Sequence, residues 1–158
     1  MVSKVELYIR RADDELLLAR TNFDISTKVE VKEFLKIPQN KTFFNDVISE
    51  AYYSIFYSAK AYLLTKGIET TPPEEHRRTY LAFKEFIEKG ILDKELLEIY
   101  NLEAEKAEVL LKIFLKEKGN RGKFVYNINS EANLPIASGS INNAKKFVSL
   151  IKKVIDPN

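Results

Sequence analysis

The sequence predicts an all-α protein, an up-and-down bundle of four or five helices. Apolar residues recur every three or four positions over long stretches, which is the period of an amphipathic helix. Glycines and prolines fall between these stretches, and no long stretch alternates apolar and polar residues as a half-buried strand would. The 158 residues are 45% hydrophobic, which is enough to close one core. We therefore expect one helical domain, 1–158.

The first predicted helix covers about residues 2–21, with apolar residues on one face and charges between them. Residues 22–40 are less regular, and two interpretations stay open. Ser26 or Thr27 could cap a short helix, whereas Val29 and Val31, which alternate with charges, also fit a short strand. Pro38 ends either element.

The second predicted helix, 43–66, begins after Thr42 as its cap and ends at Gly67 as a left-handed stop. It carries the most apolar and aromatic run of the chain on two faces, so we expect it in the middle of the bundle. One face holds residues that we predict to line a dimer interface or a pocket: Tyr53, Tyr57 and Lys60. An aromatic stripe at this spacing is also typical of a core. We expect Lys60 and Glu50 at the surface.

The third predicted helix, 72–89, follows Thr71-Pro72-Pro73-Glu74, which has the pattern of a capping box with proline at the first helical position. Gly90 ends it. A fourth helix, 93–117, begins at Asp93 as its cap. Residues 119–139, rich in glycine and asparagine, are predicted to form a loop, and the last helix covers 140–155.

The composition excludes several classes of chemistry. The chain has no cysteine and a single histidine, His76, so disulfides, thiolate zinc sites and most imidazole metal sites are excluded. We expect no metal and no cofactor. No stretch has the zones of a signal peptide or the length of a membrane span, so we expect a cytoplasmic protein without a membrane partner.

The charge is uneven along the chain. Between Lys112 and Lys153, nine Lys or Arg residues accompany only Glu117 and Glu131. Such a basic region favours a polyanionic partner, although lysines on solvated helix faces explain it equally well.

Within this region, Arg121 and Lys123 supply cations suited to phosphate, and Tyr126 supplies an aromatic plane. These three residues are the predicted phosphate- or RNA-binding residues. Their structural alternative is a basic turn that neutralises the C-terminal dipole of a helix.

The run from Ala51 to Gly67, A-Y-Y-S-I-F-Y-S-A-K-A-Y-L-L-T-K-G, resembles the R-A-Y-Y-A-x-F-Y-A-A-x-A-L-L-x-x-x-G core of the HEPN superfamily, in particular its UPF0332 branch. The segment around His76, the stretch Arg121 to Tyr126 and the last predicted helix resemble later elements of that branch. The resemblance implies a helical bundle, a homodimer, and association with a nucleotide, RNA or a partner nucleotidyltransferase, often in a toxin–antitoxin system.

The ribonucleases of that superfamily use an arginine followed four to six residues later by a histidine. Here Tyr126 stands five residues after Arg121, and Glu50 replaces the arginine that precedes A-Y-Y. Arg121 and Tyr126 remain the candidate catalytic residues, but the sequence favours a non-catalytic or weakly catalytic protein. One alternative is an active metal-independent ribonuclease that uses Arg121 with Tyr126 or His76. The other is a structural dimerisation module.

Overall fold

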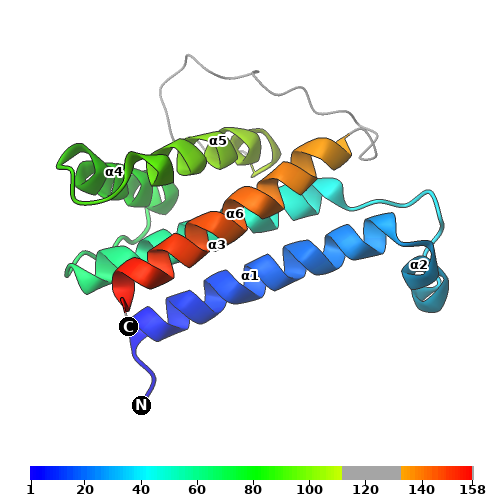
Figure 1. Ribbon diagram of the computed structural model, residues 1–158, viewed down its shortest axis with the longest axis horizontal. Helices are drawn as coiled ribbons and strands as arrows, with labels where there is room; N and C mark the ends of the chain where they lie inside the picture. The colour runs from blue at the N-terminus through cyan, green and yellow to red at the C-terminus, as the bar shows by residue number, and fades with distance from the viewer. Residues whose placement is uncertain (112–132, 158) are drawn as a thin grey trace.

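The computed structural model describes residues 1–111 and 133–157, and those residues form helices joined by loops, without a strand (Figure 1). The all-α prediction is therefore confirmed for this part of the chain. The helices are α1 (Lys4–Thr27), α2 (Val29–Leu35), α3 (Phe44–Thr65), α4 (Glu75–Glu88), α5 (Lys94–Leu111) and α6 (Leu134–Ile155). None of these described helices combines the length and the apolar character that crossing a membrane requires.

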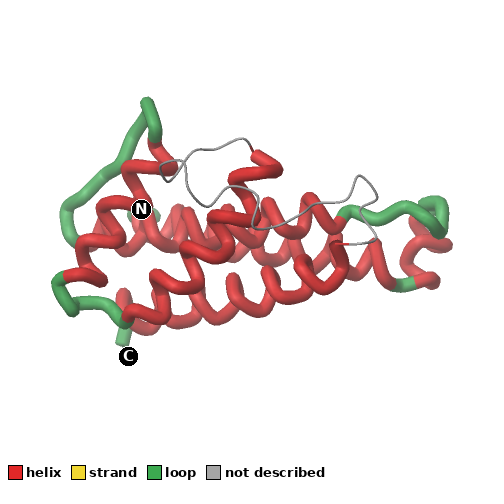
Figure 2. Tube along the Cα trace, turned by 90° about the horizontal axis from the view of Figure 1, so that it is seen from above, coloured by secondary structure: helices red, strands yellow, loops and turns green. Residues whose placement is uncertain are grey.

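Helix α3 is the centre of the bundle and contacts α1, α4, α5 and α6. Helices α1 and α6 run beside it, and α5 lies on the side away from α1 (Figures 1 and 2). Tyr52, Ile55 and Ala59 on one side of α3 are completely buried, and so are Ile48 and Ala51. The predicted central position of this helix is confirmed.

Tyr100 of α5 joins three helices in the core. Its buried ring meets the edges of Tyr80 of α4 at 5.3 Å and Phe147 of α6 at 5.8 Å between ring centroids. Such edge-to-face contacts are favoured by the quadrupoles of the rings. The α4–α5 pair is thereby fixed against α6 and α3.

The N-terminal helix is longer than predicted, and its beginning and end have identifiable causes. Ser3 and Glu6 form a reciprocal capping box at its start, a signal that is visible in the sequence. At its other end, Ser26 lies inside α1 and does not cap the next helix. The short segment that follows, Val29–Leu35, is a helix, which settles the choice between helix and strand.

The predicted cap of α3, Thr42, is wrong, because the N-cap residue is Phe43, which makes no side-chain cap hydrogen bond. Instead, the backbone N–H of Phe43 donates to Oγ of Ser26 on α1 at 2.7 Å. A residue distant in sequence thus satisfies a donor at the start of α3, which no local pattern indicates.

The start of α4 also differs from the prediction. Glu74 has a left-handed backbone, φ 57° and ψ 37°, so the helix begins at Glu75 and the proposed capping box does not form. By contrast, Gly67 and Gly90 have φ 76° and 72°, as helix stops require, and Asp93 Oδ1 accepts from the N–H of Glu95. These three predictions are confirmed.

Helix α6 begins at Leu134, several residues before the predicted start at 140. Pro135 occupies its first turn, where a missing N–H costs nothing, and Gly139 lies within the helix. A Cβ atom on Gly139 would lie 3.8 Å from Nζ of Lys106. Gly139 was predicted to lie in a loop, but it lies within α6 where this helix packs on α5.

Candidate functional site

The predicted site residues fall into two groups. Arg121, Lys123 and Tyr126 lie outside the described residues. Tyr53 and Tyr57 are half-buried on α3, and Lys60 is only 4% exposed, so its expected surface position is wrong.

A groove of about 470 Å³ lies where α1, α3 and the start of α4 meet. We call it the tyrosine groove, and these residues line it: Leu7, Tyr8, Arg11, Tyr57, Lys60 and Glu75. Its volume is within the range of small-ligand pockets. The sequence pattern of α3 predicted Tyr57 and Lys60 as site residues. The lining residues from α1 and α4 could be found only once the packing of the helices was known.

A row of aromatic rings runs along this groove. Tyr8 stacks on Tyr57 across the α1–α3 contact, with centroids 6.1 Å apart and planes 19° from parallel. Tyr57 stacks in turn on Tyr53, also at 6.1 Å. The guanidinium of Arg11 lies 4.9 Å from the centroid of the Tyr57 ring, within the range of a cation–π contact.

Lys60 connects α3 to the start of α4 at the groove. Its ammonium group donates to the carboxylate of Glu75 and, at 3.1 Å, to the carbonyl oxygen of Thr70, and it lies 4.8 Å from the centroid of Tyr8. Burial alone would lower the pKa of Lys60, but the contacts with Glu75 and Tyr8 outweigh it and raise the pKa above its usual value. Lys60 is thus a fixed cation that ties α3 to α4.

His76 lies behind the groove in the first turn of α4. Its ring stacks on Phe56 at 4.1 Å between centroids, and its Nδ1 is 2.8 Å from the hydroxyl of Tyr52. Burial lowers the pKa of His76 and Lys60 adds to this effect, while Glu75 opposes it. The imidazole is therefore neutral at pH 7.

The family model for the HEPN domain matches residues 5–157 of this chain. The chain belongs to the HEPN family. This confirms the superfamily resemblance of the Ala51–Gly67 run, while the UPF0332 branch stays a prediction. A relative from Methanocaldococcus jannaschii, named "Putative toxin MJ0142", is 44% identical over 63 residues. That match spans 39% of this chain and 41% of the relative, so it covers less than half of either protein.

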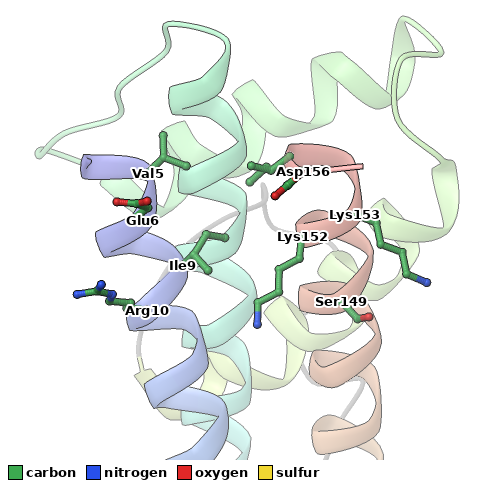
Figure 3. Close-up of a pocket in the computed structure, with 9 residues that line it drawn as sticks. Val5, Glu6, Ile9, Arg10, Ser149, Lys152, Lys153 and Asp156 are labelled. Atoms are coloured by element: carbon green, nitrogen blue, oxygen red, sulfur yellow. The ribbon is translucent and has the colours of Figure 1, made fainter. Parts of the chain in front are cut away.

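A wider groove of this HEPN domain, about 740 Å³, lies between the start of α1 and the end of α6 (Figure 3). Its lining combines apolar Val5, Ile9 and Ile155 with charged side chains of both signs: Glu6, Arg10, Lys152, Lys153 and Asp156. Lys152 extends into the space between the helices and bonds to Asp13 at 2.6 Å. None of the described residues that line this groove is aromatic, and the mixed charge of the lining selects no class of ligand.

A buried polar network joins α5 to α6 in the HEPN bundle. Glu103 is completely buried, and its Oε2 accepts from Nζ of Lys106 at 2.9 Å and from Nδ2 of Asn143 at 3.0 Å. Lys106 also donates to Oγ of Ser140 at 3.2 Å. The other carboxylate oxygen, Oε1, has no hydrogen-bond partner among the described residues. The sequence gives no sign of this network, because Glu103 and Lys106 resemble an ordinary surface pair three residues apart.

Within residues 1–111 and 133–157, no group of three or more His, Cys, Asp or Glu side chains is placed to hold a metal ion.

Proposed function

We propose that this HEPN protein is a toxin-type protein that binds RNA or a nucleotide as a homodimer and is non-catalytic or weakly catalytic. Membership of the HEPN family and the name of the M. jannaschii relative support the toxin class. The observation that carries the ligand class is the tyrosine groove.

The groove combines the two features that nucleotide binding requires. The half-buried rings of Tyr8 and Tyr57 already stack on each other, and in this proposal a base joins their row, since base–aromatic stacking contributes about 1–3 kcal/mol per base. Arg11 stands over Tyr57 and lies 3.5 Å from Glu15, but its side chain is 56% exposed, so its free guanidinium N–H groups can contact a phosphate. Lys60 is already bonded to Glu75, so we assign it a positioning role.

Arg121, Lys123 and Tyr126 keep, as a prediction, the phosphate-binding role that the basic region and the family resemblance give them. In this proposal the tyrosine groove stacks a base, and Arg121 contributes charge.

Binding of a fluorescently labelled single-stranded RNA, measured by anisotropy, tests the proposal. Tyr57→Leu should weaken binding about tenfold because it removes the stacking plane, whereas Tyr57→Phe should bind like the wild type. Arg121→Ala should also weaken binding, and Arg20→Ala, an exposed arginine elsewhere on α1, serves as its control. Equal affinity of wild type and Tyr57→Leu would remove the groove from the proposal, and no RNA or nucleotide affinity at all would overturn it.

A second candidate function is metal-independent RNA cleavage, and the neutral imidazole of His76 is the observation that favours it. A neutral histidine can accept the proton of a 2′-hydroxyl group, and Arg121 would hold the phosphate. Incubation of structured and single-stranded RNA with the protein in EDTA tests this function. Cleavage that is lost in both His76→Gln and Arg121→Ala supports it, and absence of cleavage by the wild type rejects it.

The nucleotidyltransferase partner rests on the family resemblance alone. Its test is co-expression with the product of an adjacent nucleotidyltransferase gene, followed by purification through a tag on one protein. Separation of the two proteins during purification would reject this partner.

A further inference from the structure

The outer face of α1 carries two exposed leucines, Leu7 and Leu18, and Leu7 also lines the rim of the tyrosine groove. Leu7 and Leu18 are 53% and 46% exposed, and Arg11 and Asp14 are exposed between them. At about 100° per residue, these four positions fall within about 60° of one another around the helix axis. They therefore form one narrow strip, which we call the α1 strip.

The spacing of the α1 strip has a symmetry that suits one particular partner. Its members are four, three and four residues apart, which is the seam of a coiled coil. The order Leu, Arg, Asp, Leu is also complementary to itself when a second copy runs in the opposite direction. Each leucine then faces a leucine, and each arginine faces an aspartate. A two-fold interface requires this kind of self-complementarity.

We propose that two copies of the protein pair antiparallel along the α1 strip, about a two-fold axis level with Ala12 and Asp13. In this arrangement Leu7 packs on the partner's Leu18. The exposed guanidinium of Arg11, whose Nε lies 3.5 Å from Glu15 of its own chain, also pairs with the partner's Asp14. This inference rests on the homodimer of the proposed function and names the surface that forms it.

The charges select the direction of the helices. In a parallel pairing with the same seam, Arg11 would face the partner's Arg11, and Asp14 would face the partner's Asp14, so both contacts would be repulsive. In the antiparallel pairing both become attractive. Exposed ion pairs contribute little to affinity, so the leucines supply the burial and the charges supply the specificity.

The pairing also brings the partner to the tyrosine groove. Leu7 and Arg11 belong to both the α1 strip and the groove lining. The partner's Leu18 therefore lies at the rim of the groove, and each groove is completed by the other copy.

The test uses charge reversal on the full chain, with mass measured by sedimentation equilibrium across a range of concentrations. The wild type should form dimers. Arg11→Glu and Asp14→Lys should each weaken the dimer about tenfold, because each replaces two attractive contacts by two repulsive ones. An equimolar mixture of the two variants should restore a dimer, since Glu at 11 then meets Lys at 14 and Arg11 meets Asp14. The double variant should restore it as well.

Arg20→Glu makes the same charge change on another face of α1 and should leave the dimer unchanged. Far-UV circular dichroism checks that each variant is folded. A wild-type monomer would overturn both the pairing and the proposed homodimer. Single variants as dimeric as the wild type would overturn only the α1 pairing, and RNA affinity, measured separately, reports on the rest of the proposed function.

Discussion

The hydroxyl of Tyr52 lies 2.8 Å from Nδ1 of His76, and this contact joins the middle of α3 to the first turn of α4. Burial raises the pKa of Tyr52 well above its usual value, so the phenol keeps its proton. The pair stacks beside Phe56 directly behind the tyrosine groove. The back of the groove is thus fixed by one hydrogen bond between the buried ring of Tyr52 and the half-buried ring of His76.

Tyr52→Phe should lower the free energy of unfolding by about 1–2 kcal/mol, because it removes this bond and leaves Nδ1 of His76 without its partner. Urea denaturation measures the change. Tyr62→Phe is a matched control, since the buried hydroxyl of Tyr62 has no hydrogen-bond partner in the described part of the chain and its loss should cost little. Equal effects of the two substitutions would show that the Tyr52–His76 bond does not stabilise the fold.

Protonation of His76 should lower the free energy of unfolding as the pH falls below 7. Its pKa is lowered in the folded protein, so the unfolded chain binds a proton first. The contribution of neutral His76 to the free energy of unfolding is fully present above the pKa of the unfolded chain, about 6.5. It is lost as the pH falls through the pKa of the folded protein. The stability difference between wild type and His76→Phe should therefore shrink from pH 7.5 to pH 5 in urea titrations. A difference that does not vary with pH would contradict a neutral, half-buried imidazole.

The contribution of Glu50 to stability should be lost as the pH rises, the opposite of His76. Burial raises its pKa from 4.5 to about 7, aided by Asp46 and Glu15, although Asn22 opposes the shift by donating to both carboxylate oxygens. The contribution of protonated Glu50 to the free energy of unfolding is fully present below pH 4.5. It is lost as the pH rises through about 7, the pKa in the folded protein. Glu50→Gln should therefore stabilise the protein at pH 8, by about 1 kcal/mol for this partly solvated group, and have little effect at pH 4.5. Thermal melting at the two pH values checks this, and an equal effect at both would contradict it.

Lys106→Met should be strongly destabilising. It leaves the completely buried carboxylate of Glu103 without its cation, and loss of one partner of a buried ion pair costs about 3–5 kcal/mol. The double variant Glu103→Gln, Lys106→Met should recover most of this loss, because the uncompensated charge is gone. Chemical denaturation of the three proteins provides the measurement. A double variant that is no more stable than Lys106→Met would show that packing, and not charge, sets the cost.

Much of the candidate site could not be predicted from the sequence. Tyr53, Tyr57 and Lys60 were identified because their helical spacing places them on one face. Tyr8 and Glu75 were not, since nothing near them in the chain shows that α1 and α4 meet α3 at that face. The burial of Lys60 depends on that meeting, because Glu75 supplies its counter-ion.

Local sequence patterns predict the helices of the bundle and several of their ends. Periodicity marks the apolar faces, and Gly67, Gly90 and Asp93 act through their own backbone and side chain, so their effects are local. Three other features depend on how the helices pack: Ser26 accepts a bond from the start of α3, α6 begins before Gly139, and the tyrosine groove forms. The reason is physical: these features depend on atoms of different helices coming together, and local sequence carries no record of which helices will pack.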